Sequence, residues 1–576
     1  MSTRTRTTAL AGTLVLASLA LAAPASPAAA RGQIPAANTQ EAERKEYVVL
    51  ATNEASVAAA QAAVVAAGGQ VTAVNTDVGL LTVEAPAEGF AGAVSANTAV
   101  TGVAENRAIG QAPENGRKAR WEDIEKETEA RAAARGQRQA SRAAAQAAEP
   151  LADLQWDMRM IKATPQGSYG VNPGRKGVLV GIIDTGIDGN HPDIKPNFDA
   201  ALSRNFTTDI EDIDGPCADE PDASCEDAAD VDEDGHGTHV AGTVASPLNG
   251  VGIGGVAPNV TLVNLRAGQD SGYFFLQATV DALTYAGRNG IDVVNMSFFV
   301  DPWLYNCAAN PADSPEEQAE QRTIIEATQR AVRFARRHGV TLVAAMGNEA
   351  TDLGRPTIDV ISPDYPVGTE KTRTVDNTCL DMPTEAEGVI SISALGPSGK
   401  KADYSNYGTE QTDFSAPGGY FRDFLGTPQN RVVENLILAP YPAALAIANG
   451  EADPTTGQSL TPFVIAQCAG ATADTCTYWQ YLQGTSMASP HAAGVAALVV
   501  SAHGRKDKAH GGLTLDPGEV ERVMRKTAID TACPNPREVS YVPEGRPEEW
   551  TAFCDGPVWK NGFYGHGIVN ALGAVR

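Results

Sequence analysis

The stretch Val178-Leu179-Val180-Gly181-Ile182-Ile183-Asp184 decides the fold: an apolar run without a polar side chain ends abruptly in a carboxylate. A continuous apolar run of this length is typical of a β-strand buried on both faces, as in a parallel sheet. Further strand candidates, apolar for most of their length, lie at 260–265, 291–296, 340–345 and 389–394. The sequence therefore predicts five buried strands, with Asp184 placed where the first of them ends.

Segments typical of helices lie between several of these runs. Residues 323–338 form one and are followed by Gly339, and residues 488–502 form an almost wholly apolar one, which we expect to be central. Asp516-Pro517-Gly518-Glu519 has an N-cap residue, a proline for the first turn and a glutamate for a capping box. Strands that alternate with helices predict an α/β fold with a doubly wound, mostly parallel sheet. In such folds ligands bind beyond the carboxyl ends of the strands.

The composition is that of a soluble globular protein. The chain has 576 residues, of which 43% are hydrophobic and 20% charged, and its formal net charge is -26. Such an acidic balance argues against nucleic acid and anionic membrane surfaces as partners.

The first 30 residues have the pattern of a secretory signal peptide. Arg4 and Arg6 precede an apolar run over 9–23, and Ala28-Ala29-Ala30 offers a small-residue cleavage site. The run is short for a membrane span, so an N-terminal anchor is the weaker alternative. No later stretch is long and apolar enough to cross a bilayer. We therefore expect secretion, with no membrane association after maturation.

Eight cysteines agree with export to an oxidising compartment. The sequence leaves their connectivity open, and zinc is a competing interpretation that the lack of any Cys-x-x-Cys spacing disfavours. We expect neighbours to pair in chain order, as Cys217–Cys225, Cys307–Cys379, Cys468–Cys476 and Cys533–Cys554.

Two segments separate the signal peptide from the main α/β region. Within residues 31–106, the part from 46 predicts the order β-α-β-β-α-β, a split βαβ module. Residues 107–150 are rich in Ala, Arg and Glu; Glu122/Lys126 and Glu127/Arg131 are helix-supporting pairs, but no apolar stripe is present. We interpret 107–150 as a solvated, cleavable linker and 151–576 as the main domain.

Three motifs in the main region carry residues suited to nucleophilic catalysis. Asp184 ends the first strand, His236 lies among small residues in Asp234-Gly235-His236-Gly237-Thr238, and Ser486 follows a glycine turn that enters the central helix. A serine hydroxyl needs a base to accept its proton, and histidine titrates near neutrality. A buried carboxylate holds the imidazole in the required tautomer.

An acyl-transfer site also needs donors for the negative charge that develops on the carbonyl oxygen. Asn348, in Ala345-Met346-Gly347-Asn348-Glu349, supplies a side-chain amide at the end of a predicted strand. The backbone N–H of Ser486, at a helix start, is the second candidate donor.

The motifs, their Asp…His…Ser order and the Gly-Asn segment resemble the subtilases. The resemblance covers most of 155–576, and residues 46–106 resemble the inhibitory pro-domains of that family. It implies that Asp184 orients the imidazole, His236 acts as general base and then general acid, Ser486 is acylated, and Asn348 donates to the oxyanion. Segments 297–299 and 345–347 would line a groove that binds the substrate backbone by strand addition.

Some residues near these motifs depart from the family pattern or have structural interpretations. Ser297-Phe298-Phe299-Val300 places Phe299 where many subtilases have glycine, which adds bulk beside the substrate. The stretch over 420–482 is long for the family, and we expect a structural surface insertion. We expect His239 and His491 to serve helix packing.

The resemblance also implies structural calcium. Asp193 and Asn249 match calcium-ligand positions of the family, and the carbonyl groups of Pro247, Val251 and Ile253 would complete an oxygen cage. An ordinary loop is the alternative. About half of the residues from 209 to 234 are carboxylates, which suits either weaker calcium binding or a solvated acidic flap.

Together these features predict a secreted, monomeric serine endopeptidase that acts on peptide or protein substrates and is inhibited by its own pro-domain. One alternative is an exopeptidase that removes short N-terminal peptides, with a groove blocked by the 420–482 insertion. Another is an inactive calcium-dependent binding scaffold, against which the complete triad and Asn348 argue. The residue preferred before the cleaved bond and the maturation site stay open.

Overall fold

The structure is a computed structural model, and it describes residues 44–105, 125–126, 149–219, 224–365 and 368–576. The predicted signal peptide and most of the predicted linker lie outside the described residues. Among the helices in the described part of the chain, none has both the length and the apolar character needed to cross a bilayer.

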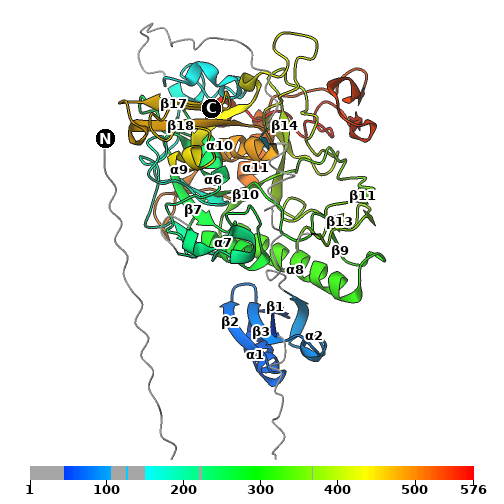
Figure 1. Cartoon of the computed structure of the whole chain (residues 1–576). Helices are drawn as coiled ribbons and strands as arrows, with labels where there is room; N and C mark the ends of the chain where they lie inside the picture. Colours follow the sequence, from blue (N-terminus) through cyan, green and yellow to red (C-terminus); the bar gives the residue numbers. More distant parts are fainter. Residues whose placement is uncertain (1–43, 106–124, 127–148, 220–223, 366–367) are drawn as a thin grey trace, which may run out of the picture. The chain divides into compact units, whose positions relative to one another are not determined.

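A seven-stranded parallel sheet forms the centre of the main domain, in the order β15-β14-β10-β8-β5-β7-β6. Strands β7, β10 and β14 of this sheet are labelled in Figure 1. The five predicted strands are all present within it. Its members are β5 Leu179–Ile183, β6 Arg204–Asn205, β7 Thr261–Arg266, β8 Val293–Met296, β10 Thr341–Ala345, β14 Val389–Leu395 and β15 Phe414–Pro417.

Helices cover both faces of this sheet, which confirms the doubly wound fold. The core on one face contains residues of α6 His236–Ala245 and α10 Thr485–His503, and the core on the other contains residues of α7 Leu276–Arg288 and α8 Pro315–Arg337. Adjacent strand residues alternate between the two cores, with Val293 in the first and Val294 in the second, as the pleat of a strand requires.

The predicted central helix is α10, and almost all of its residues are buried. The predicted helix at 323–338 starts earlier than expected, at Pro315. Ser314 accepts a hydrogen bond from the Glu317 N–H, and the Glu317 side chain accepts from the Ser314 N–H, so a capping box fixes the start. The first two turns are polar, so the spacing of apolar residues did not predict them. Helix α11 Pro517–Thr527 begins where predicted, with Asp516 as its N-cap.

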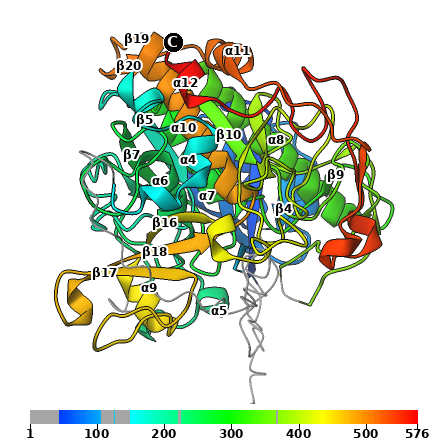
Figure 2. The ribbon, with the colours of Figure 1, turned by 90° about the horizontal axis from the view of Figure 1, so that it is seen from above.

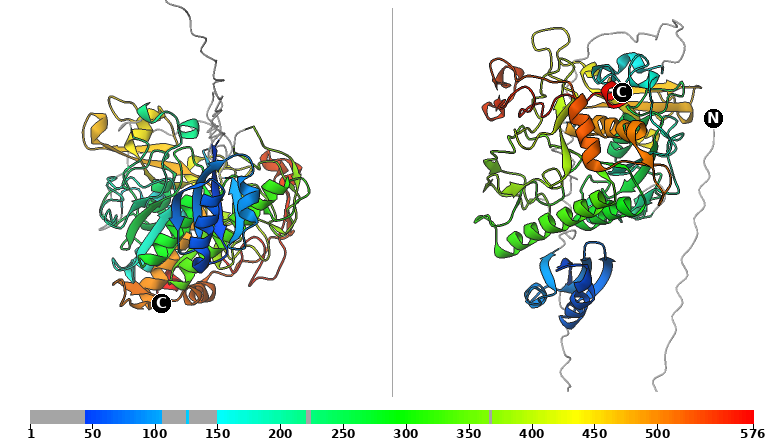
Figure 3. Two further views of the ribbon diagram at one scale, coloured as in Figure 1. Left: turned by 90° about the horizontal axis from the view of Figure 1, so that it is seen from below. Right: turned by 180° about the vertical axis from the view of Figure 1, so that it is seen from behind.

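The small N-terminal module has the predicted order of elements, and its sheet is visible in blue in Figure 3. Strands β1 and β3 pair antiparallel, and the sheet order is β2-β3-β1-β4. The elements are β1 Arg44–Ala51, α1 Val57–Ala66, β2 Gln70–Asn75, β3 Leu80–Pro86, α2 Phe90–Ser95 and β4 Val100–Glu105.

One face of this module contacts α7 and α8 of the main domain. The Arg330 guanidinium on α8 donates to the carbonyl oxygens of Ala51 at 2.7 Å and Val78 at 3.2 Å. The Asn75 amide donates to Asp281 and Thr284 of α7, both at 2.7 Å. Apolar residues of the module share a core with both helices, so the contact combines apolar burial with hydrogen bonds.

The 420–482 stretch folds into a three-stranded antiparallel sheet with one helix, which extends from the body in yellow and orange in Figure 2. Its elements are β16 Ile437–Tyr441, α9 Ala443–Ala448, β17 Val464–Cys468 and β18 Cys476–Leu482. The buried His239 of α6 donates to the carbonyl oxygens of Ile437 and Gln480 in this sheet. His239 therefore packs α6 against the insertion, and the expected structural role is confirmed.

All four predicted disulfides are formed, with no exception among the eight cysteines. The shorter elements are α4 Trp156–Met160, α5 Glu211–Asp214, α12 Ala571–Ala574, β9 Asn306–Cys307, β11 Ile358–Asp359, β12 Arg373–Thr374, β13 Cys379–Leu380, β19 Arg505–Lys506, β20 Leu513–Thr514, β21 Glu538–Val539 and β22 Ala552–Phe553.

Candidate active site

Asp184 and His236 meet beyond the carboxyl end of strand β5. Asp184 is fully buried, and its Oδ1 accepts a hydrogen bond from His236 Nδ1 at 2.7 Å and from the Thr185 N–H at 2.9 Å. His236 is the first residue of α6, and Gly237 behind it has no room for a side chain, because a Cβ there would lie 2.0 Å from the Gly186 carbonyl oxygen. The carboxylate thus fixes the tautomer in which Nε2 faces outward.

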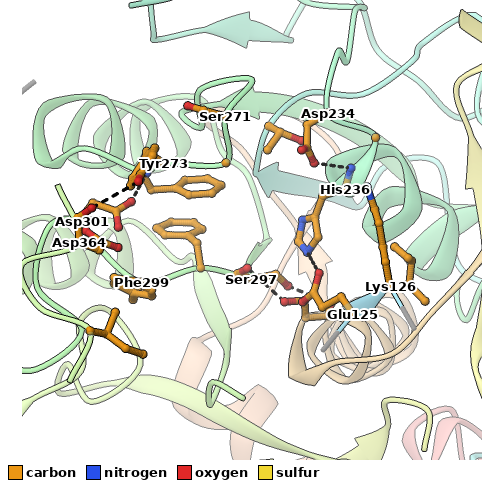
Figure 4. Close-up of a pocket in the computed structure, with 18 of the residues that line it drawn as sticks. Glu125, Lys126, Asp234, His236, Ser271, Tyr273, Ser297, Phe299, Asp301 and Asp364 are labelled. Carbon is orange, nitrogen blue, oxygen red and sulfur yellow. Dashed lines mark hydrogen bonds and ion pairs between the residues drawn. The ribbon is translucent and has the colours of Figure 1, made fainter. Parts of the chain in front are cut away.

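The outward nitrogen of His236 faces a carboxylate from the predicted linker. His236 Nε2 lies 3.6 Å from Glu125 Oε2, and both side chains are largely buried. Figure 4 shows the imidazole pointing toward Glu125, with Ser297 beside it. A segment that we interpreted as solvated therefore places one side chain inside the site.

Two carboxylates change the acid–base state of His236. Burial by itself lowers the pKa of His236, but the charges of Asp184 and Glu125 on either side raise this pKa to about 10. Burial raises the pKa of Glu125, and the nearby His236 and Ser486 counteract that effect. At neutral pH the imidazole is protonated in this arrangement, so it cannot accept a proton from serine.

Ser486 lies in the first turn of α10, against the end of β8. Its hydroxyl has one hydrogen to donate and two acceptors within reach, the Glu125 carboxylate and the Ser297 carbonyl oxygen, which lies 3.4 Å away. Within the described residues no hydrogen bond joins Ser486 to His236. The turn before it needs glycine, since Gly484 has φ 153° and a Cβ there would lie 2.8 Å from Glu125 Oε1.

Asn348 is buried just beyond β10 and is oriented by the start of α10. Its Oδ1 accepts from the Thr485 N–H at 2.9 Å and the Thr485 hydroxyl at 3.0 Å, which directs its NH₂ group at Glu125 Oε1, 3.5 Å away. The N–H groups in the first turn of α10 have no partner within their helix. The Glu125 carboxylate therefore lies where the amide of Asn348, the hydroxyl of Ser486 and the imidazole of His236 converge.

Two pockets adjoin Ser486. The larger is lined by Glu125 and His236 and also by Tyr273, Ile361 and Asp364, with Gln480 and Leu482 of the insertion on its wall; it covers about 1170 Å³ with open solvent included. The smaller covers about 250 Å³, again with open solvent included. Its lining consists of Ser297, Phe298, Phe299, Ala345, Gly347, Asp381, Thr485 and Ser486. Both predicted groove segments, 297–299 and 345–347, thus contribute to the pocket walls, and Phe299 borders both pockets.

Residues of the expected calcium site lie together but are partly engaged with each other. Asp193 Oδ2 accepts from the Ile253 N–H and from the indole N–H of Trp479, both at 2.9 Å, while its buried Oδ1 has no partner in the described structure. Asn249 Oδ1 accepts from the Val251 N–H at 2.8 Å. No hydrogen bond from the described residues reaches the carbonyl oxygens of Pro247, Val251 or Ile253. A buried carboxylate oxygen with no donor, in contact through its partner oxygen with the loop that carries these carbonyl groups, fits a hard cation.

The acidic region over 209–234 contributes instead to a buried ion-pair cluster. Asp209 and Asp227 lie with Asp270 close enough to hold a cation, and the Arg266 guanidinium already contacts all three carboxylates. That side chain supplies the positive charge at this position.

Two residues at the site were missed by sequence reasoning. Glu125 stands in a segment whose composition is that of a linker, and the only available signal was that a cleavable linker must pass the catalytic serine. Asp381 belongs to no motif, and only the fold brings it to the pocket beside Ser486.

Comparisons with known proteins agree with this geometry. Residues 175–563, more than half of the chain, match the model of the subtilase family. The chain is 28% identical over 340 residues to subtilisin DY from Bacillus licheniformis, covering 59% of this chain and 81% of that protein. It is 26% identical over 357 residues to the nisin leader peptide-processing serine protease NisP from Lactococcus lactis, covering 62% of this chain but only 45% of that protein.

A solved structure supports the fold. The epidermin leader peptide processing serine protease EpiP from Staphylococcus aureus superposes with a TM-score of 0.56 at 19% identity, over 93% of this chain and 98% of that one. With the sheet, the Asp184–His236 pair and the family match in agreement, the chain belongs to the subtilase family and is a subtilisin-like serine protease.

Proposed function

We propose that this serine endopeptidase is secreted as a self-inhibited precursor and hydrolyses peptide bonds through Asp184, His236 and Ser486. The observation that carries the proposal is the convergence of three groups on one point, occupied here by the Glu125 carboxylate: the imidazole of His236, the hydroxyl of Ser486 and the amide of Asn348. These are the base, the nucleophile and the oxyanion donor that acyl transfer requires.

The proposed reaction begins once Glu125 has left. The pKa of His236 then falls, because one of two adjacent carboxylates is gone, and the neutral imidazole accepts the Ser486 proton as the oxygen attacks the substrate carbonyl. Asn348 and the Ser486 N–H donate to the oxyanion. His236 returns the proton to the leaving amine, and water then hydrolyses the acyl-enzyme by the same steps. Asp184 keeps the imidazole oriented throughout.

The lining of the larger pocket favours endopeptidase action. Besides Glu125 and His236 it includes Tyr273 and Ile361, so the pocket is not confined to the reacting groups. The insertion contributes Gln480 and Leu482 to its wall. These features count against the exopeptidase alternative.

The N-terminal module and linker are proposed to form the inhibitory pro-segment. The module contacts α7 and α8 through hydrogen bonds and a shared core. Glu125 blocks the reacting groups, and its own carbonyl oxygen accepts from the Gln483 N–H at 3.2 Å instead of facing Asn348. The bond after Glu125 is therefore not presented for attack, and we place the maturation cleavage elsewhere in the linker.

Export and calcium complete the proposal. Residues 1–30 are proposed as the signal peptide, and the four disulfides suit an oxidising compartment. Asp193 and Asn249, with the carbonyl groups of Pro247, Val251 and Ile253, are proposed to hold a structural Ca²⁺, which would add stability without entering the reaction.

A fluorophosphonate probe tests the proposal. We expect the matured protein to be labelled on Ser486 and to cleave internal bonds in a peptide library read by mass spectrometry. The matched control is Ser489→Ala, which should keep the label on Ser486. Ser489 is a buried serine three residues further along the same helix, and its hydroxyl donates to Asn295 Oδ1 at 2.7 Å. Labelling that survives Ser486→Ala would refute the assignment of the nucleophile.

A further inference from the structure

The smaller pocket beside Ser486 has an acidic residue in its lining. Asp381 is 2% exposed, and the rest of the lining is apolar or uncharged. Because the pocket begins at the nucleophile, it is placed to hold the side chain of the substrate residue whose carbonyl is attacked. A buried carboxylate in that position decides which side chains can enter.

Asp381 has no cationic partner in the described structure. Its buried Oδ1 makes no hydrogen bond, and no Lys, Arg or His in the described residues forms an ion pair with it. Its charged neighbours are the acids Glu349 and Glu385, and burial together with these two carboxylates raises the pKa of Asp381 well above its usual range. An uncompensated buried acid of this kind is costly to the fold, so a ligand that compensates it is favoured.

The loop that carries Asp381 is held firmly in place. Cys379, two residues earlier, is bonded to Cys307, and the Val300 N–H donates to the Met382 carbonyl oxygen at 2.8 Å. The Asp381 N–H donates to Glu385 Oε2 at 2.9 Å. The carboxylate is therefore preorganised, as a specificity determinant should be, and does not depend on substrate to position it.

The pocket walls suit a long side chain that ends in a cation. Phe298 and Phe299 line the same pocket as Ser486 and Asp381, and aromatic faces pack well against the aliphatic stem of lysine or arginine. A purely apolar side chain would fill the pocket but leave Asp381 without a partner, and an acidic side chain would add a like charge.

We propose that Asp381 makes this enzyme select lysine or arginine at the residue before the cleaved bond. The inference rests on the proposed function, since it assigns a specificity to the same site. The linker itself offers such residues after the blocked position, at Arg131, Arg135, Arg138 and Arg142. Cleavage after one of them would remove Glu125 from the active site.

The test compares matched peptides that differ only at that residue, using matured enzyme whose Ser486 has been titrated with a fluorophosphonate. We expect kcat/KM to be about 10²- to 10³-fold higher for arginine or lysine than for leucine, as expected for a desolvated charge pair. Asp381→Asn should remove most of that preference while leaving the leucine peptide nearly unchanged. Glu387→Gln is the control, because Glu387 is an exposed acid in the same loop.

The outcomes separate the two proposals. A titrated enzyme that prefers leucine or phenylalanine, or whose preference for arginine survives Asp381→Asn, overturns the role of Asp381 and leaves the catalytic assignment intact. If Ser486 is not labelled and no peptide is cut, the proposed function fails, and a binding measurement still decides the pocket. Benzamidine should then bind full-length Ser486→Ala protein at least about tenfold more tightly than the Ser486→Ala/Asp381→Asn protein. Equal binding would refute the inference.

Discussion

Asp184, which contacts His236, and Asp381, which lines a pocket with Ser486, are two buried carboxylates that differ in their partners. Asp184 contacts the imidazole of His236 at 2.7 Å, whereas Asp381 has no cationic partner in the described part of the chain. The cluster around Arg266 is of the first kind, with three carboxylates on one guanidinium. Other buried acids, such as Asp232 and Asp292, form no ion pair in the described residues but accept hydrogen bonds from backbone N–H groups. The buried Oδ1 of Asp381 has no hydrogen-bond partner in the described residues, and the residue lines a pocket beside Ser486, which together point to a cationic ligand.

Loss of the nucleophile should have the largest effect on catalysis. Ser486→Ala removes the attacking oxygen and should lower turnover by about 10⁶-fold, to the residual level left when a catalytic triad is removed. The precursor should also stay uncleaved if its maturation is autocatalytic. Mass spectrometry of the purified protein and the rate on a peptide substrate check both. Mature, active Ser486→Ala protein would refute the assignment.

The two carboxylates should differ sharply when each is made neutral. Asp184→Asn should lower kcat by about 10⁴-fold for every substrate, because the amide favours the wrong imidazole tautomer. Asp381→Asn, by contrast, should act only on substrates with a basic residue before the cleaved bond. Parallel rates on arginine and leucine peptides distinguish the two patterns. If Asp381→Asn lowered the rates on arginine and leucine peptides equally, as Asp184→Asn should, Asp381 would not be a specificity determinant.

The oxyanion donor should have a smaller effect. Asn348→Ala should reduce kcat by about 10²- to 10³-fold with little change in KM, because its amide is needed most when charge develops on the carbonyl oxygen. Asn348 also accepts two hydrogen bonds from Thr485, so the thermal unfolding of the variant must be measured beside its kinetics. An unchanged kcat in a folded variant would remove Asn348 from the mechanism.

Glu125→Gln tests how the charge of the linker carboxylate affects the pKa of His236. In the precursor the pKa of His236 is about 10, so the neutral fraction needed for self-cleavage increases about tenfold per pH unit below that value. The glutamine keeps the shape but removes one charge, so the pKa should fall and self-cleavage should reach its plateau at a lower pH. The rate of precursor processing between about pH 6.5 and 9 measures this.

Docking of the linker in the active site should also depend on pH. Asp184 and the docked Glu125 together raise the pKa of His236, and only the part due to Glu125 depends on docking. That part makes the charged imidazole favour docking at neutral pH, and the contribution is lost as the pH rises through about 10. The mature enzyme, without Glu125, should show activity that increases through a pKa nearer 6 to 7. If the unmodified precursor and the Glu125→Gln precursor process themselves with identical pH profiles, Glu125 does not hold the site closed.

Residues with a local signal were predictable from sequence, and residues without one were not. The apolar run ending at Asp184 specified both a buried strand and the position of its carboxylate, because continuous apolar sequence has few other uses in a soluble protein. The start of α8 at Pro315 was missed since its first turns are polar. Asp381 was missed for a different reason: its role depends on a loop brought beside Ser486 by tertiary structure, and no local pattern encodes that.

The smallest expected effect concerns stability. Asp193 Oδ1 is buried without a donor, and burial raises the pKa of Asp193 to about 8 despite hydrogen bonds from Ile253 and Trp479. A bound cation would reverse that shift, and an ion that binds only the folded state stabilises it in proportion to the logarithm of its concentration over Kd.

Chelation should therefore shorten the half-life of the mature enzyme at elevated temperature by a few-fold, without changing the initial rate. Asp193→Asn should show the shorter half-life with or without calcium, since the substitution keeps the shape but removes the charge that attracts the ion. The measurement is residual activity against time, with calcium and with chelator. Asp188→Asn, which changes a neighbouring carboxylate that binds the Asn190 and His191 N–H groups, is the control and should keep its response to calcium. Superimposable decay curves for the unmodified protein would exclude calcium from this loop, and the unpaired oxygen of Asp193 would then have to be explained by protonation of its carboxyl group at neutral pH.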